Sequence, residues 1–182
     1  LHAKSGTALL DHFADILRAL GRQQGLLGDI FAQAMPRFNN PVNLRRVIAM
    51  IDEEDWSSLE VDVKGEAFEG LLEKAASEGK KGAGQYFTPR VLIQSIVRVM
   101  KPDPRGKPDF TICDPACGSG GFLVRAYEWL VAETKGAFDR TEAKRIRTKT
   151  YYGQDLVPRP RRLALMNLYL HGVEPHIYLG DT

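Results

Sequence analysis

Cysteine is scarce in this chain, and its scarcity removes one common source of binding chemistry. The 182 residues include only two cysteines, Cys113 and Cys117. No further cysteine or nearby histidine completes a metal-binding set, so we expect no metal site. Few cysteines also fit a protein of the reducing cytosol, and we expect a cytoplasmic location.

Long hydrophobic runs are missing as well. No apolar run approaches the roughly 20 residues needed to span a bilayer, and no charged-then-apolar leader with a cleavage site is present. The composition, with 43% hydrophobic and 26% charged residues, is that of an ordinary soluble globular protein. A chain of this length buries one core, or one core with a helical appendage. We therefore expect a protein without a membrane partner.

Neither sign of charge is in large excess over the whole chain, but the charged residues are unevenly distributed along it. The net charge is +2; residues 1–83 contain 10 Lys/Arg and 13 Asp/Glu, whereas residues 84–182 contain 15 and 10. The second part is therefore basic, which mildly favours a polyanionic partner there. Its segment 135–149 holds six basic and two acidic residues. We interpret that segment as a solvated extension of the preceding helix and its loop, with contact to phosphates as the alternative.

The first 83 residues have the periodicity of helices. Apolar residues recur at steps of three and four, and the runs end at glycine or proline. The predicted helices cover Thr7–Leu20, Leu26–Met35, a third from Pro41 to the acidic cluster at 52–55, and Lys64–Ala76. We expect a helical N-terminal domain over residues 1–83, whose last residues belong to the glycine-rich connector Glu78–Gly84.

Strands and helices alternate from residue 84 onward. A helix is predicted from Thr88 and Pro89 to Met100, because threonine caps and proline opens helices. Strands are predicted at Phe110–Asp114, Tyr151–Gln154 and His176–Leu179, and helices at Gly121–Glu133 and Pro160–His171. This alternation is typical of an α/β fold with a Rossmann-like, doubly wound parallel sheet. Three strands make a poor sheet of that kind, so we expect it to be incomplete at the C-terminus.

The most informative segment is Asp114–Leu123, with the sequence DPACGSGGFL. A strand, a Gly-Ser-Gly turn and a helix in this order are typical of nucleotide-type cofactor sites, where Gly118 and Gly120 permit a sharp turn and close approach of a ligand. Asp114 suits a positively charged amine and would repel a pyrophosphate. The segment matches neither Gly-x-Gly-x-x-Gly nor a phosphate loop. S-adenosylmethionine is therefore favoured over a dinucleotide or ATP, although many α/β proteins have such a turn without a ligand.

An acid stands at the end of each predicted strand. Asp114 ends the first, Asp155 follows the second and Asp181 follows the third. The carboxyl ends of parallel strands form the cofactor site of an α/β sheet. A carboxylate at Asp155 suits the two ribose hydroxyls, and Asp181 suits an exocyclic adenine amine. Any one such acid is more often a turn residue or a helix cap, but three around a glycine loop favour a binding site.

Four segments together resemble the ordered motifs of N6-adenine DNA methyltransferases. They are Gly84–Pro89 (GQYFTP), Asp114–Leu123, Tyr152–Asp155 (YGQD) and Gly180–Thr182 (GDT). The resemblance is strongest to the modification (M) subunit of type I restriction–modification systems, and Gly65–Leu72 (GEAFEGLL) shares it. It covers roughly residues 39–182, whereas residues 1–38 fit only as generic helices.

The resemblance implies a function and partners. The chain would be the S-adenosylmethionine-binding portion of a site-specific DNA adenine-N6 methyltransferase, with residues 84–182 as the N-terminal part of its catalytic domain. Its partners would be DNA, a specificity subunit and a restriction subunit, together forming a hetero-oligomer.

The resemblance also assigns cofactor contacts. Tyr86, Phe87 and Thr88 would line the methionine end, and Asp114 would meet the amino group. Asp155, where many relatives carry Glu, would hold the ribose, and Asp181 the adenine amine. The full cofactor-binding set that we predict is Tyr86, Phe87, Thr88, Asp114, Pro115, Cys117, Gly118, Gly120, Asp155 and Asp181.

One motif of that family is absent, the catalytic Asn/Asp-Pro-Pro-Tyr/Phe. The stretch Asn39–Val42 (NNPV) does not replace it, because it has one proline and lies in the helical part. In relatives the motif follows the Gly-Asp-Thr stretch, where this sequence stops. We therefore assign no catalytic residue and interpret the chain as an N-terminal fragment of a larger subunit, inactive alone.

Three other interpretations stay open. A nicotinamide-dependent oxidoreductase shares the sheet and the ribose acid, but Asp114 and the misplaced third glycine disfavour it. A non-catalytic cofactor-binding module is disfavoured by the unfinished sheet. The third is a stand-alone N6-adenine DNA methyltransferase with its own recognition domain.

Overall fold

The computed structural model describes residues 1–59, 61–78 and 88–181. Contacts divide the chain into two compact units, Leu1–Leu59 and Glu60–Thr182. Within the described ranges, each helix is too short or too polar to cross a bilayer.

Three helices form the first unit: α1 (Gly6–Gly21), α2 (Leu26–Phe31) and α3 (Pro41–Asp52). α1 packs against both α2 and α3. Each helix contributes one buried apolar side chain, namely Leu9, Ile30 and Leu44. Burial of such a side chain contributes about 1.5–3 kcal/mol relative to exposure, so the apolar stripes hold this unit together.

The boundaries of these helices follow local backbone rules. α3 begins where Asn40 Oδ1 accepts a hydrogen bond from the Val42 amide at 2.8 Å. α2 was predicted to reach Met35 but ends at Phe31. The reason is local: Ala32 turns to an extended conformation, and Gln33 has a φ of 55°.

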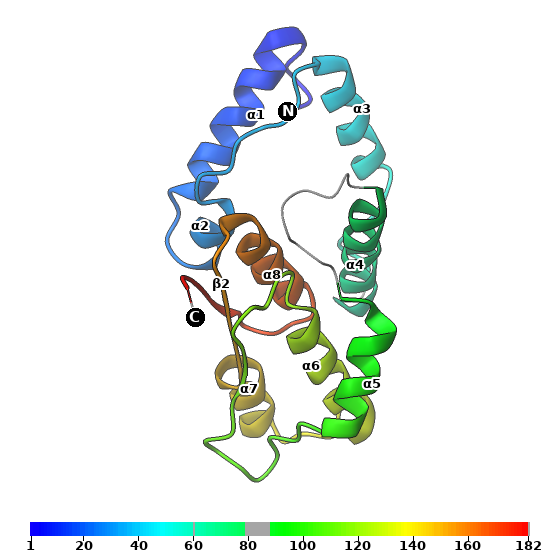
Figure 1. The fold of residues 1–182 in the computed structure, drawn as a ribbon. Helices are drawn as coiled ribbons and strands as arrows, with labels where there is room; N and C mark the ends of the chain where they lie inside the picture. The colour runs from blue at the N-terminus through cyan, green and yellow to red at the C-terminus, as the bar shows by residue number, and fades with distance from the viewer. Residues whose placement is uncertain (60, 79–87, 182) are drawn as a thin grey trace. The chain divides into compact units, whose positions relative to one another are not determined.

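The second unit is an α/β structure (Figure 1). In chain order its described elements are α4 (Val61–Glu78), α5 (Arg90–Met100), β1 (Ile112–Asp114), α6 (Gly121–Thr134), α7 (Arg140–Lys149), β2 (Tyr151–Asp155), α8 (Pro158–Leu170) and β3 (His176–Leu179). Strands and helices alternate from β1 onward, as the sequence predicts.

The three strands form one parallel sheet in the order β1-β2-β3. The register pairs Asp114 with Gly153 and Asp155 with Leu179. This confirms the prediction of a Rossmann-like parallel sheet. β1 begins at Ile112 rather than Phe110, and its short length leaves Asp114 at the carboxyl edge.

Helices α6 and α8 cover the sheet and pack against each other, and α5 lies along α6 (Figure 1). Their inner faces supply the fully buried side chains Leu123, Leu130, Leu165 and Leu168. This core fixes the loop between β1 and α6, where the predicted cofactor site lies.

Helix α4 belongs to the second unit and packs against α8. The predicted domain boundary at 83/84 had grouped this helix with the N-terminal helices. Ion pairs as well as packing join α4 to the second unit, because Glu69 of α4 pairs with Arg90 of α5 and Arg125 of α6. The 83/84 boundary falls among residues that the structure does not describe, and as a boundary between functional domains it stays a prediction.

The basic segment 135–149 is a helix of its own rather than an extension of α6. Lys135 (φ 52°) and Gly136 (φ 69°) end α6 in left-handed conformations, and Asp139 caps α7 by accepting from two backbone amides. The buried Ile146 packs α7 against β2. Arg145 donates to the Pro104 carbonyl at 2.8 Å, so this cation has a structural partner.

Candidate cofactor site

The loop between β1 and α6 turns on two glycines in left-handed conformations. Gly118 has a φ of 55° and Gly120 a φ of 79°. A Cβ on Gly120 would lie 3.3 Å from Ala164 Cβ, so this glycine also lets α6 and α8 approach. At Gly118 a Cβ would meet nothing within 4 Å. Gly118 therefore serves the turn and leaves open space beside the main chain.

Asp155 is tied directly to this loop. Its Oδ2 accepts from the Gly118 amide at 3.0 Å, and its Oδ1 accepts from the Val157 amide at 2.8 Å. The carboxylate at the end of β2 thus holds the glycine turn of the neighbouring strand. Each carboxylate oxygen retains further acceptor capacity, so the same group can receive hydroxyls from a ligand.

Asp114 is a half-buried anion at the end of β1. Burial raises the pKa of its carboxyl, and the nearby charge of Asp155 raises it further, against the hydrogen bond from the Ala116 amide (3.2 Å). Both unfavourable effects would be relieved by a cation. The site therefore suits a ligand with a positively charged amine.

Cys117 has a packing role in this loop. It is buried, its amide donates to the Gln154 carbonyl at 2.9 Å, and burial with the charges of Asp114 and Asp155 raises the pKa of its thiol to about 12. A thiol of that pKa is a poor nucleophile at neutral pH. A Cβ on Gly153 would lie 3.1 Å from Cys117 Cβ, so the thiol fills the space beside β2.

A cavity of about 160 Å³ opens beside the loop. Of the predicted contacts, Thr88, Asp114, Cys117 and Gly118 line it. Gly120, Asp155, Pro115 and Asp181 are not among its lining residues, and Pro115 and Asp181 are exposed. Tyr86 and Phe87 lie outside the described residues. The rest of the wall combines apolar side chains such as Ile93 and Phe122 with three charged ones, Glu69, Arg90 and Arg125, which come from three different helices.

These charged residues belong to a buried network that the sequence did not predict. Glu69, only 5% exposed, pairs with Arg90 at 2.9 Å and with Arg125. Arg125 also pairs with Glu128. The network joins α4, α5 and α6 around one carboxylate. The stretch Gly65–Leu72 was the available signal, but spacing along one helix cannot show which cations it meets.

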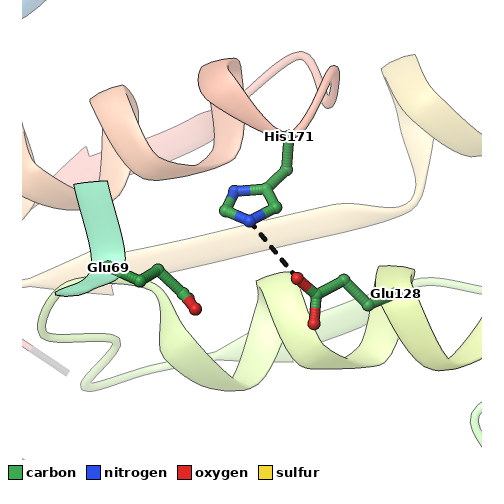
Figure 2. A group of neighbouring side chains, drawn as sticks. All are labelled: Glu69, Glu128 and His171. Carbon is green, nitrogen blue, oxygen red and sulfur yellow. Dashed lines mark ion pairs between the residues drawn. The ribbon is translucent and has the colours of Figure 1, made fainter. Parts of the chain in front are cut away.

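His171, at the end of α8, extends the network (Figure 2). Its Nδ1 lies 2.8 Å from the Asn167 carbonyl and must therefore carry the hydrogen, while Nε2 lies 3.3 Å from Glu128 Oε1. Gly65 lets α4 approach, because a Cβ there would lie 2.5 Å from His171 Nε2. Burial lowers the pKa of His171, but the Glu128 carboxylate and the Asn167 carbonyl outweigh it and the net shift is upward.

Glu69, Glu128 and His171 could also be taken for a metal-ligand set, since their ligand atoms lie within 4.8 Å of one another (Figure 2). The two guanidinium groups argue against it. Arg125 pairs with both carboxylates, and Arg90 pairs with Glu69. A divalent cation would have to displace these groups or lie beside their charge. The arrangement is better described as an ion-pair network that joins helices.

The Glu128–His171 pair predicts a pH dependence of stability. The pKa of His171 is raised from 6.5, so its contribution is complete below that value and lost as pH rises through the folded-state pKa. The pKa of Glu128 is lowered from 4.5: burial alone would raise it, but His171 and Arg125 prevail. The contribution of Glu128 to folding stability is therefore lost only as pH falls below 4.5 and through the lowered pKa of the folded state. The urea midpoint should be higher at about pH 6 than at about pH 8.5.

Glu128→Gln provides the control for this prediction. It keeps the shape of the side chain but removes the charge that favours the imidazolium, so the fall in midpoint between the two pH values should be smaller. An equal fall in both proteins would contradict the assigned role of the pair.

The fold and the site define a Rossmann-like protein with a cavity and a half-buried carboxylate beside its glycine turn. A family model described as N-6 DNA Methylase matches residues 59–182. The chain belongs to this N-6 DNA methylase family. The predicted kinship with DNA adenine methyltransferases is thereby confirmed.

Individual relatives of the chain are methylase subunits of type I restriction enzymes. The chain is 35% identical to the type I restriction enzyme StySPI methylase subunit of Salmonella potsdam, over 100% of this chain and 35% of that protein. Identity and coverage are the same for the EcoKI methylase subunit of Escherichia coli K12. The structure of a type I restriction-modification system methyltransferase subunit from Streptococcus thermophilus matches with a TM-score of 0.70 and 23% identity, over 97% of this chain and 37% of that one. This last likeness shows the fold. The chain thus spans about a third of the length of these relatives.

Proposed function

We propose that this chain is the S-adenosylmethionine-binding portion of a type I modification (M) subunit that methylates adenine N6 in DNA. The observation that carries the proposal is the contact between Asp155 and the Gly118 amide, beside the half-buried Asp114. It joins the carboxyl ends of two neighbouring strands to one glycine turn. Family membership and the methylase subunits among the relatives support the same activity.

In this proposal each residue has a distinct task. Asp155 accepts hydrogen bonds from the ribose hydroxyls and holds the Gly118 turn. Asp114 receives the amine of the amino-acid end, and Gly118 leaves room for the ligand beside bare backbone. Thr88, in the wall of the cavity, is placed at the methionine end with Tyr86 and Phe87, and Asp181 is assigned to the adenine amine. The bound cofactor supplies an electrophilic methyl group.

The partners are proposed from the family. The relatives are subunits of type I restriction enzymes, and we infer that this chain acts on DNA together with a specificity subunit and a restriction subunit. The target adenine would be flipped out of the duplex to reach the methyl group.

Asp155→Ala should weaken binding of S-adenosylhomocysteine, the demethylated product. The expected loss is about 1.5–3 kcal/mol, the range for hydrogen bonds to a charged group. Isothermal titration calorimetry on the two proteins would measure it, with circular dichroism to verify that both are folded.

The matched control is Asp139→Ala. Asp139 also accepts two backbone hydrogen bonds, from Thr141 and Glu142 at 2.8 Å, but it caps α7. It should cost stability without changing affinity for the ligand. Tight NAD binding with no binding of S-adenosylhomocysteine would overturn the proposed function.

A further inference from the structure

The cavity beside the glycine loop has charges of both signs in its wall, the carboxylates of Asp114 and Glu69 and two guanidinium groups. Asp114 comes from the end of β1, and Arg90 and Arg125 come from α5 and α6. Its volume of about 160 Å³ is smaller than the roughly 300–1,000 Å³ of pockets that hold a whole drug-sized ligand. The cavity therefore suits one end of a ligand. An α-amino acid, with an ammonium and a carboxylate on the same carbon, matches the two signs of charge.

Arg90 is held in a fixed position and still has donor capacity. Its Nε pairs with Glu73 at 2.6 Å and its Nη2 with Glu69 at 2.9 Å. Both nitrogens are buried, and neither has a partner with hydrogen-bond geometry among the described residues. The guanidinium group thus lies beside two carboxylates and retains unused hydrogen-bond donors.

Arg125 is less suited to meet a ligand. Its two terminal nitrogens pair with Glu69 and Glu128. Its side chain is 12% exposed, compared with 28% for Arg90. Arg125 therefore supports the network from inside, and Arg90 is the cation that a ligand can reach.

The position of Arg90 in its helix favours an anion as well. It is the first residue of α5, whose start has no side-chain cap. A helix N-terminus carries partial positive charge, so an arginine there is stabilised only by nearby anions. Glu69 and Glu73 provide two. A ligand carboxylate would add to them and would also interact favourably with the end of the helix.

An acceptor for the ammonium group is present on the same wall. Asn167, 1% exposed, donates through Nδ2 to the Ser119 carbonyl at 3.0 Å. Its Oδ1 is buried and has no hydrogen-bond partner among the described residues. Together with Asp114, this oxygen can receive an ammonium donor.

We propose that Arg90 binds the carboxylate of the cofactor's amino-acid end and so positions S-adenosylmethionine in the cavity. This inference rests on the proposed function and adds Arg90 as a cofactor-binding residue that the sequence motifs did not assign. Glu69 and Glu73 act through Arg90 by holding its guanidinium group at the cavity wall.

The test combines a protein variant with a change of ligand. Arg90→Gln should lower affinity for S-adenosylhomocysteine at least about tenfold, the typical effect of losing a charge-assisted hydrogen bond. Affinity for 5′-methylthioadenosine, which has no amino-acid end, should change less than about twofold. Arg90→Lys should recover part of the loss. Arg98→Gln, an exposed arginine on the same helix, controls for the change in net charge.

The outcomes separate the possibilities. If the unaltered chain binds neither ligand, the proposed function fails. If it binds both, and Arg90→Gln weakens both equally or neither, Arg90 is not a carboxylate ligand and this inference is overturned. Should Arg90→Gln not fold, the unaltered chain is titrated with decarboxylated S-adenosylhomocysteine. Equal affinity for the two nucleosides would then overturn the inference.

Discussion

Incubated with unmodified DNA and saturating S-adenosylmethionine, the 182-residue chain alone is expected to transfer no methyl group. The residues proposed to bind the cofactor are present, but the motif that would hold the acceptor adenine is not. No two prolines are adjacent in the sequence, so an Asn/Asp-Pro-Pro-aromatic segment is absent. In the family that the chain resembles, this segment accepts hydrogen bonds from the flipped adenine and stacks on it. Incorporation of radiolabelled methyl groups into DNA is the measurement.

The matched experiment joins the chain to a segment with that motif and adds a specificity subunit. Transfer to adenine N6 should then appear, and the Asp155→Ala variant should reduce it. Robust incorporation by the chain alone would mean that the catalytic residues lie elsewhere in this sequence.

Replacing Glu69 by alanine is expected to cost about 1.5–3 kcal/mol of folding free energy, the range for hydrogen bonds to charged groups. The loss stays below the cost of an uncompensated buried charge, about 3–5 kcal/mol, because Glu73 and Glu128 still pair with the two arginines. Here Arg90 and Arg125 would both lose their shared carboxylate. Urea unfolding followed by circular dichroism would measure the loss.

Glu73→Ala is the control in the same helix. Glu73 also pairs with Arg90, but its side chain is 40% exposed, and pairs of that kind contribute about 0–1 kcal/mol. If the two variants were equally stable, the Glu69 network would not be what holds α4 to the second unit.

The sequence predicted the parts of the fold that depend on local patterns. Alternating strands and helices, the glycine turn and the capped start of α3 follow from spacing and residue type. The end of α2 and the separate α7 were missed, because single residues such as Gln33 and Lys135 adopt left-handed conformations that periodicity does not reveal.

The candidate site likewise has features that the sequence predicts and features that only the structure shows. The placement of Asp114 and Asp155 at one edge of the sheet was predictable, since the carboxyl ends of neighbouring parallel strands meet there; their role in binding a cofactor stays a prediction. The hydrogen bond from Gly118 to Asp155 depends on strand register and could not be read from the chain. Likewise, the pairing of Glu69 with Arg90 and Arg125 depends on the packing of three helices, and only the structure shows it.

The central claim is that the glycine loop between β1 and α6 binds S-adenosylmethionine. A crystal structure of the chain with S-adenosylhomocysteine tests it most directly. The account predicts density beside Gly118, with ribose hydroxyls within hydrogen-bond distance of Asp155 and the amino-acid end between Asp114 and Arg90. Density for the ligand at another place, with this cavity empty, would contradict it.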